Sequence, residues 1–575
     1  MAGITKEIVT LQVGHFSNFV GTHWWNLQDA SFVYDPKEAA NKEVNTDVMF
    51  REGQNLMGEV TYTPRLIGFD LKGSLNTLKQ DGNLYDLNLE EDLKWAADVT
   101  QHKVEVGEKN DFLLDLERQQ EAHIDGSERK RRKVEEDEKM EIGDVSKESS
   151  PTDIEEDLTK KLYHLEKNIK VWSDFLKIYL HPKSLYVLQD YSHNSENEPF
   201  DIFSYGSAIY NTRTHQDEID DKLHFFLEEC DHLQGFHVLT DTFDGFGGLS
   251  TSLLEHLEDE YSSKGIFTFG LSPAHHGDTT TYQDSLRVIN SVLTYNKAAT
   301  HSSAFLPLST CQEQWRKPQG PLQFPHTNFD ARLAYHSSAV LAACLDTMSL
   351  PYRLDGSAMT MTHITDALTQ CNRKVLTLNA SFPFTLNQSQ SLIGRLMELE
   401  DELPWQPLGP YPTSKSKLFS QSMVLRGIPP NRMKSVSDKD VHSVLGKCND
   451  YQDLLQLYST EMFPYTLNSC FVVKQPCKVI APFPNIFRDN LTPDGQLSQT
   501  PRLPTVGVET VPIWTSLQSN PTAATMLNKL IHEAKRLDIN KYHKFKDSGL
   551  EQDDYNEMLN SLEDMASNYS TQLME

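Results

Sequence analysis

Residues 8–21, near the N-terminus, have the sequence IVTLQVGHFSNFVG. The first six are mostly apolar and rich in β-branched side chains, which predicts a short strand. Gly14 ends this run, and a helix-like pattern follows it as far as Trp24-Trp25. A strand, a glycine turn and a helix in this order are typical of the opening βα unit of a nucleotide-type fold.

The same alternation continues through the first half of the chain. Residues 65–71 (RLIGFDL) predict a second strand that carries an acid, Asp70, near its end. Further strands are expected at 184–188, 236–240 and 265–269, and helices at 170–176, 223–230 and 253–261. Repeated strand-then-helix units with short connections predict an α/β fold with a doubly wound, mainly parallel sheet.

Beyond about Tyr352 the pattern changes to α+β. Strands are expected at 375–378 and 471–473, and another ends at 479–482. Two amphipathic helices are expected at 522–537 and 554–569. We therefore divide the chain into a nucleotide-fold domain (1–116 and 161–352), a disordered charged insertion (117–160), an α+β second domain (353–510) and C-terminal helices (511–575).

Composition excludes several classes of protein. The 575 residues contain 82 acidic and 53 basic side chains, so the net charge is -29 and a phosphate backbone would be repelled; we expect no nucleic-acid partner. There is no apolar run near the roughly 18 residues of a membrane span and no apolar core at residues 1–10. The seven cysteines are dispersed without a CxxC pair, which favours reduced thiols in the cytosol over disulfides or a zinc knuckle.

The insertion contains a basic run, Arg129–Lys133, followed by acids at 135–138. A solvated charge block in a loop is the favoured interpretation. The alternative is a nuclear import signal, which would add the nucleus to the expected locations.

Four stretches, in the same order along the chain, resemble tubulin. Residues 230–237 (CDHLQGFH) are nearly identical to tubulin's Cys-Asp-x-Leu-Gln-Gly-Phe-Gln, and 244–250 follow where tubulin has its glycine-rich loop. Residues 8–21, 62–71 and 520–524 are also similar to tubulin segments. The whole chain therefore resembles a member of the tubulin superfamily rather than a fusion of domains.

Other residues narrow the resemblance to the misato family, a divergent branch of that superfamily. These are Phe16, Trp24-Trp25, and the stretches 71–75 and 171–176. The resemblance implies a cytoplasmic protein that also resides at the mitochondrial outer membrane. It further implies a role in mitochondrial distribution, morphology, fusion and network maintenance.

The tubulin resemblance also implies a vestigial GTP pocket. The residues at the positions of that pocket are Gly14, His15, Asn18, Asp70, Gly245, Gly247, Gly248 and Asp330. Asp244 stands where tubulin has a glycine, and two unit charges roughly 4 Å apart at an effective dielectric of about 20 repel by about 4 kcal/mol. Each of these residues also has a structural interpretation: a tight glycine turn, a cap at Asp70, or a packed His15.

Two further tubulin features are weak here. Trp95-Ala96 is the remaining trace of one nucleotide-binding loop of tubulin. In tubulin a catalytic loop that acts on the nucleotide of the neighbouring subunit is expected between the positions of Tyr352 and His363, but only about ten residues separate the two here. We interpret this as a deletion and expect no GTP hydrolysis, no catalytic residue and no required cofactor, although GTP or GDP could still be held. The pair His275-His276 lacks a third ligand and helical spacing, so no metal site is expected.

The leading hypothesis is a non-enzymatic scaffold or adaptor, attached peripherally through protein partners at the mitochondrial surface. A slow-folding, nonlocal sheet also suggests the cytosolic chaperonin as a folding partner. The alternatives are a GTP-binding switch or GTPase, and a tubulin relative that associates with microtubules.

Overall fold

The computed structural model describes residues 6–33, 42–55, 58–85, 107–120, 161–193, 195, 197–315, 319–399, 402–412, 417–433 and 445–570. The charged run Arg129–Lys133 and the pair Trp95-Ala96 lie outside these residues. Residues 111–120 are helical, so the boundary expected at residue 117 falls inside a helix.

The first sheet has six strands, all parallel, in the order β5-β4-β1-β6-β7-β8. The strands are β1 (Ile8–Val13), β4 (Leu66–Lys72), β5 (Leu185–Ser192), β6 (Gly235–Asp241), β7 (Gly265–Leu271) and β8 (Ala304–Leu308). All six residues of β1 are buried, as a parallel strand covered on both faces requires. The predicted doubly wound sheet is confirmed, and the strand order reverses between β1 and β6.

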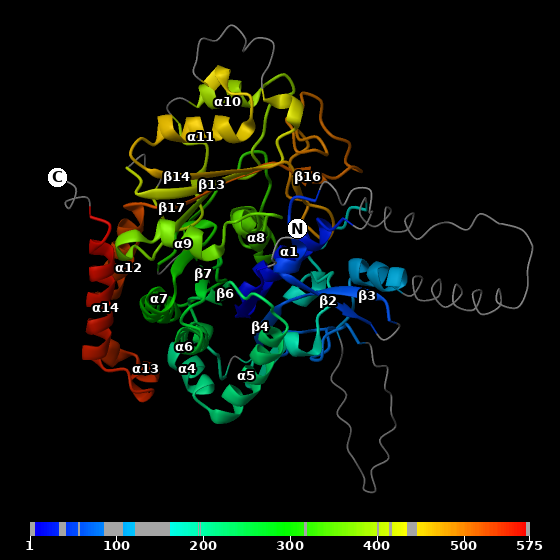
Figure 1. The fold of residues 1–575 in the computed structure, drawn as a ribbon. Helices are drawn as coiled ribbons and strands as arrows, with labels where there is room; N and C mark the ends of the chain where they lie inside the picture. The colour runs from blue at the N-terminus through cyan, green and yellow to red at the C-terminus, as the bar shows by residue number, and fades with distance from the viewer. Residues whose placement is uncertain are drawn as a thin grey trace, which may run out of the picture.

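Helices cover both faces of this sheet (Figure 1). On one side lie α1 (His15–Ala30) and α8 (Ala334–Ser349), and on the other α4 (Phe203–Tyr210), α6 (Gly245–Glu260) and α7 (Thr281–His301). The helix α5 (Arg213–Glu228) continues from α4. The helix expected at 253–261 begins at Gly245, so the glycine-rich stretch is its first turn and not a loop.

The prediction of an amphipathic helix at 170–176 is wrong. Only a single 3-10 turn forms, at Trp172–Phe175. The Asp174 carboxylate accepts hydrogen bonds from the backbone N–H groups of Lys170 and Val171, at 2.8 and 3.1 Å. Because these bonds tie the start of the turn to its own side chain, the segment closes locally instead of continuing as a helix.

The second sheet has five strands in the order β12-β11-β17-β13-β14 and is mixed, with β13 and β14 parallel. Its strands are β11 (Thr377–Ser381), β12 (Gln406–Pro407), β13 (Ser420–Arg426), β14 (Leu467–Val473) and β17 (Ile513–Ser519). The central strand β17 belongs to the part assigned to C-terminal helices from residue 511, so those helices begin only at Thr522. The prediction of a strand that ends at 479–482 is also wrong, because the strand β15 ends at Lys478.

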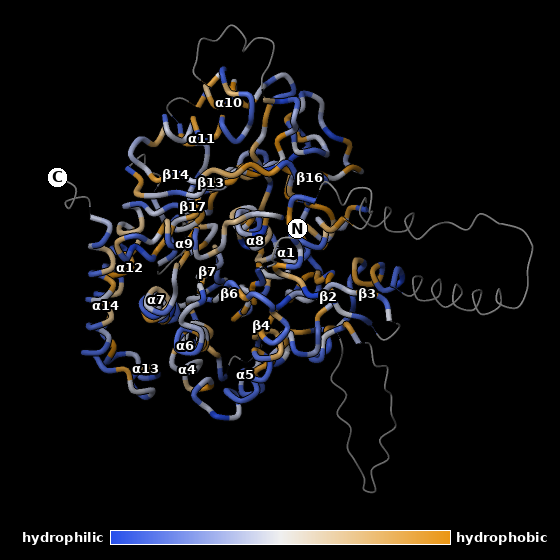
Figure 2. The backbone as a smooth tube through the Cα atoms, viewed as in Figure 1, coloured by the Kyte–Doolittle hydropathy of each residue, from blue (hydrophilic) through white to orange (hydrophobic). Residues whose placement is uncertain are grey.

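Five layers result. The helices α8 and α9 (Met361–Leu368) lie between the two sheets, and α10 (Leu392–Glu398) and α11 (Tyr451–Met462) cover the outer face of the second sheet. The C-terminal α12 (Thr522–Ala534) and α14 (Gln552–Ser567) pack against α7, and the short α13 (His543–Asp547) joins them. Figure 2 shows hydrophobic residues gathered along the strands of both sheets, with hydrophilic residues on α5 and α13.

Short pairings complete the described structure. They are β2 (Phe50–Gln54) with β3 (Val60–Pro64), β9 (Cys311–Glu313) with β10 (Gln319–Pro321), and β15 (Cys477–Lys478) with β16 (Thr510–Val511). Trp24 and Trp25 are stacked and buried on α1, which makes them core aromatics.

Candidate functional site

A cavity of about 560 Å³ lies at the carboxyl ends of the first sheet's strands. Its lining includes residues that follow four of the six strands: His15 after β1, His193 after β5, Asp244 after β6 and Pro273 after β7. The cavity therefore lies beside the point between β1 and β6 where the strand order reverses. In open α/β sheets this is the usual place for a ligand.

The N-terminus of α1 is capped by a carboxylate from another strand. The Asp241 oxygens accept hydrogen bonds from the N–H groups of Phe16 and Ser17, at 3.0 and 2.8 Å, and from the Ser17 hydroxyl at 2.7 Å. Gly14 permits this approach: its φ is +123°, and a Cβ atom there would lie 2.4 Å from the Asp241 Cγ. The backbone donors that a phosphate would use at this helix end are thus bound to the protein's own anion.

The N-terminus of α6 is capped in a similar way. Asp244 is the residue before the helix, and its Oδ1 accepts a hydrogen bond from the Phe246 N–H at 2.9 Å. Burial, and next the nearby Asp241 charge, raise the pKa of Asp244 well above its ordinary value. Burial raises the pKa of Asp241 to about 7, although its hydrogen bonds from Ser17 and Phe16 oppose the shift. Two desolvated carboxyl groups therefore face the cavity from adjacent helix ends.

The three glycines predicted for the phosphate loop do not line the cavity. A Cβ atom on Gly248 would lie 1.8 Å from the carbonyl oxygen of Phe203, and one on Gly247 would lie 2.1 Å from the Thr294 hydroxyl. The N–H of Gly245 donates to the carbonyl of Phe200 at 3.1 Å. These glycines allow α6 to pack closely on α4 and α7, which is the structural interpretation considered from the sequence.

His15 and Asp70, by contrast, meet at the edge of the cavity. The His15 Nδ1 lies 3.0 Å from Asp70 Oδ2, which also accepts hydrogen bonds from Trp172 Nε1 at 2.8 Å and Asn18 Nδ2 at 3.2 Å. Burial alone would lower the pKa of His15, but the Asp70 carboxylate raises it above its ordinary value overall. Burial alone would raise the pKa of Asp70, but the charge and hydrogen bond of His15 lower it. This ion pair is held from behind by Trp172 and Asn18.

Asp330 is not brought to the cavity. It is partly exposed, and its carboxylate accepts hydrogen bonds from the Arg332 guanidinium at 2.7 to 3.2 Å. The Arg332 partner lowers the pKa of Asp330 to about 2. The lining residue nearest to Asp330 in the sequence is Ala334, at the start of α8.

It was not predicted from the sequence that Asp241, His193 and His276 line the cavity. Asp241 had a readable signal, because it ends a buried strand three residues before Asp244. His193 had none, because its position depends on an irregularity between β4 and β5, where Leu71 pairs with Leu188 but Lys72 pairs with Ser192. Burial, and next the Arg287 charge, lower the pKa of His276 to about 3, so this ring is neutral near pH 7.

The segment between Tyr352 and His363 connects α8 to α9 by a short link. The helix α8 ends at Ser349, a 3-10 turn covers Leu350–Tyr352, and α9 begins at Met361. Asp355, in the predicted remnant of the catalytic loop, is exposed. Whether the chain hydrolyses GTP remains a prediction from this segment.

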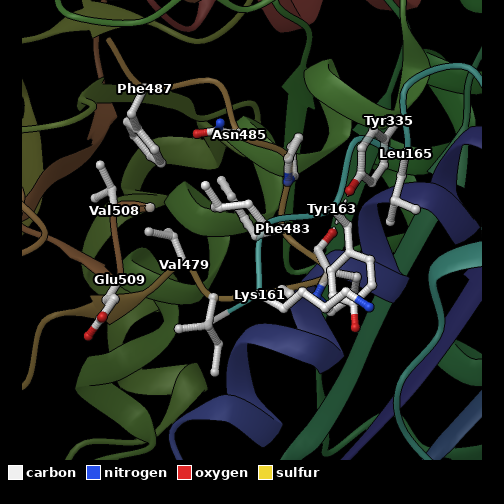
Figure 3. A pocket seen from close by; sticks show the side chains of 16 residues that line it. Lys161, Tyr163, Leu165, Tyr335, Val479, Phe483, Asn485, Phe487, Val508 and Glu509 are labelled. Atoms are coloured by element: carbon white, nitrogen blue, oxygen red, sulfur yellow. Dashed lines mark hydrogen bonds between the residues drawn. The ribbon is translucent and has the colours of Figure 1, made fainter. Parts of the chain in front are cut away.

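A second hollow, of about 40 Å³, lies between residues 161–165, 479–487 and 507–509 (Figure 3). Tyr335 lies at its edge, and its hydroxyl donates a hydrogen bond to the Pro482 carbonyl at 2.5 Å. One water molecule needs about 10–15 Å³ of such space, so this hollow accommodates water rather than a ligand.

Comparisons with known proteins agree on one family. Residues 6–118 match the model described as the Misato Segment II tubulin-like domain, and residues 163–354 match the tubulin domain. The chain is 37% identical to "Protein misato homolog 1" of Homo sapiens over 99% of both chains. It is 37% identical to the protein of that name from Danio rerio, over 99% of this chain and 98% of the other.

A more distant relative is "Protein misato" of Drosophila melanogaster, 30% identical over 97% of each chain. Among the described residues, no helix combines the length and apolar character needed to cross a membrane. The parallel sheet, the reversed strand order and these full-length similarities together place the chain in the misato family of tubulin-like proteins.

Proposed function

We propose that this chain is a non-enzymatic tubulin-like scaffold or adaptor that regulates mitochondrial distribution, morphology and fusion. The observation that carries the non-enzymatic part is the pair of carboxyl groups at the cavity, Asp241 on the N-terminus of α1 and Asp244 on that of α6. A triphosphate would have to displace both and then lie beside them. Where either carboxyl group is ionised, its charge roughly 4 Å from a phosphate charge, at an effective dielectric of about 20, adds a repulsion of about 4 kcal/mol.

The mitochondrial part of the proposal is supported by membership of the misato family. A net charge of -29 repels anionic lipid headgroups, so we expect a peripheral attachment through a protein partner at the outer membrane. The expected distribution is therefore cytoplasmic and mitochondrial. The cytosolic chaperonin is proposed as a folding partner, because the first sheet joins strands that are far apart in sequence.

The decisive experiment measures nucleotide on the purified full-length protein. The protein is denatured and any released nucleotide identified; labelled GTP is then titrated against the wild type, Asp241→Ala and Asp244→Gly. We expect no released nucleotide and no binding by the wild type, and measurable binding when a carboxylate is removed. Thr360→Gly is the matched control, because it removes the N-cap of α9 outside the cavity lining.

One observation favours a GTP-binding switch as the second candidate. A cavity of about 560 Å³ at the reversal of the strand order is large enough for a ligand and is placed where nucleotides bind in such sheets. Stoichiometric GDP or GTP released from the wild type would support this candidate and overturn the first. Hydrolysis would then be measured on the same preparation.

The cellular part is tested by complementation. Cells depleted of the endogenous relative are given this chain, and the mitochondrial network and fractionation of the protein are recorded. Restored networks and an outer-membrane fraction released by alkaline carbonate would support a peripheral regulator. Unchanged networks with a normally folded, expressed protein would contradict it, and failure to co-purify with chaperonin would remove that partner.

A further inference from the structure

Next to the two capping carboxylates, the lining residues His15 and His193 lie close to Asp70, which is buried and outside the lining. Among the described residues, His15, Asp70 and His193 each offer a ligating atom, and these atoms all lie within 4.8 Å of one another. We propose that these three side chains bind a divalent transition metal ion of the zinc class, with one coordination position open to the cavity.

The fold brings the three ligands together from three neighbouring strands. His15 is the first residue of α1, after β1; Asp70 is in β4; and His193 follows β5, in a sheet ordered β5-β4-β1. The N–H of His193 donates to the Lys72 carbonyl at 2.9 Å, which fixes the turn after the irregular pairing of β4 and β5. The ligands are therefore held by the carboxyl edge of the sheet and not by a single loop.

The spacing suits a metal ion. His15 Nδ1 lies 3.0 Å from Asp70 Oδ2, and the His15 and His193 rings are 4.0 Å apart between centroids with an interplanar angle of 34°. Zinc–ligand bonds of about 2.0–2.2 Å in a tetrahedron place neighbouring ligand atoms about 3.4 Å apart. Rotation of the half-buried His193 ring supplies the remaining adjustment, without movement of the sheet.

The carboxylate is oriented as metal-binding carboxylates usually are. The Asp70 Oδ1 accepts a hydrogen bond from the Leu71 N–H at 2.8 Å, and Trp172 Nε1 donates to Oδ2 at 2.8 Å. Such outer partners fix the direction of a ligand and are a regular part of zinc sites. Two imidazoles and one carboxylate form the ligand set of many catalytic zinc sites, in which an exogenous ligand takes the remaining position.

Carboxyl groups outnumber basic side chains in the cavity lining. Asp201, Asp241 and Asp244 line the cavity, and Arg287 is its one lining arginine or lysine among the described residues. Asp201 pairs with Lys544 at 2.9 Å, so Asp241 and Asp244 are the two without an arginine or lysine partner, and a bound cation would favour their ionised forms. Within the described part of the chain, the His193 ring makes no hydrogen bond and contacts the His15 ring. A structural role for the His15–Asp70 pair alone gives no reason for this second imidazole at the mouth of the cavity.

The test uses the full-length protein freed of metal by chelation. Zn²⁺ is titrated in competition with a chromophoric chelator, and Co²⁺ is added separately to record the visible absorption of a low-coordinate ion. We expect one Zn²⁺ per chain in the wild type. His193→Ala should weaken binding by more than the roughly 10–100-fold that loss of an outer partner costs, and should abolish the Co²⁺ absorption.

Two variants sharpen the result. Trp172→Phe removes the outer hydrogen bond to Asp70 and should weaken Zn²⁺ binding by about 10–100-fold. His275→Ala is the matched control, since His275 lines the same cavity but is outside the three-residue group. It should leave the affinity unchanged, and Zn²⁺ should raise the midpoint of thermal unfolding of this control and of the wild type but not of His193→Ala.

The proposal would be overturned if the wild type bound no Zn²⁺ at equimolar concentration, if His193→Ala bound it as tightly as the wild type, or if His275→Ala weakened it as much as His193→Ala. These outcomes are independent of the proposed function, because the metal ligands are not the carboxylates that oppose a nucleotide. His193→Ala keeps the test interpretable, because this side chain is half-buried in a turn and its loss leaves the core intact.

Discussion

Buried aspartates in two regions of the molecule have different hydrogen-bond partners and opposite pKa shifts. Between the sheets, Asp346 of α8 accepts hydrogen bonds from Arg353 at 2.8 Å and Arg426 at 2.6 Å. Burial alone would raise the pKa of Asp346, but these two guanidinium groups lower it. At the cavity, Asp241 and Asp244 have hydrogen bonds from backbone N–H groups and a serine but no arginine or lysine, and their pKa values are raised.

This difference distinguishes Asp346, whose ion pairs stabilise the fold, from Asp241 and Asp244, whose carboxyl groups lie at the candidate site. Arg426 belongs to β13 and Asp346 to α8, so their contact fixes the helix against the second sheet. The unpaired carboxyl groups lie beside open space and have raised pKa values, a combination that is typical of functional positions. Folded proteins depart from the pairing of buried charges mainly at functional positions.

The largest expected effect comes from breaking the paired charge. Asp346→Asn leaves two buried arginines without a counter-ion, and loss of one partner of a buried ion pair costs about 3–5 kcal/mol. Denaturant unfolding followed by far-UV circular dichroism measures the change in the free energy of unfolding. A change no larger than that of Asp217→Asn, a mostly exposed position on α5, would contradict the structural role of the pair.

A smaller effect tests whether the glycines in the first turn of α6 serve packing. Gly248→Ala places a methyl group against the Phe203 carbonyl, and such overpacking costs about 1–3 kcal/mol. Gly53→Ala is the control, because its nearest neighbour would be 3.6 Å away. Equal midpoints of thermal unfolding for the two variants would mean that the glycine is not needed for packing α6 on α4.

The pH dependence of stability distinguishes the two kinds of aspartate. Folding raises the pKa of Asp241 from 3.8 to about 7, so between these values the folded state holds a proton that the unfolded state has lost. Stability contributed by this group therefore falls as the pH rises from about 4 to 7, by at most about 1.4 kcal/mol per pH unit. Asp241→Asn should reduce this slope to the part that Asp244 contributes, measured by urea unfolding at pH 5, 6, 7 and 8.

For Asp346 the sign is opposite. Its pKa is lowered on folding, so its contribution is present above the ordinary value of 3.8 and is lost as the pH falls below it. Asp346→Asn should therefore leave the slope between pH 5 and 8 as in the wild type. A slope that becomes smaller in Asp346→Asn and is unchanged in Asp241→Asn would reverse the comparison.

The smallest effect is expected at Asp330. Its carboxylate pairs with the exposed Arg332 and does not line the cavity, so Asp330→Ala should change neither GTP nor Zn²⁺ titrations. The measurement is the same pair of titrations on the variant and the wild type. A clear change in either would return Asp330 to the site and require a different arrangement of this segment.

Much of the fold could be predicted from local patterns. The run of apolar, β-branched residues at 8–13 and the break at Gly14 became β1 and the start of α1. The 170–176 segment was misjudged because Asp174 satisfies nearby N–H groups, a local alternative that apolar spacing does not reveal. β17 was missed as a strand because its place in the middle of the second sheet depends on β11 and β13.

The sequence by itself determined the parallel sheet, the position of its first glycine turn and the presence of an acid, Asp244, at the start of α6. These follow from side chains that are neighbours along the chain. Only the tertiary structure decided that Asp241 caps α1, 224 residues away from Ser17, and that His193 lies over His15. Strand order and the irregular pairing of β4 with β5 create these contacts, and neither is encoded in the spacing of any single segment.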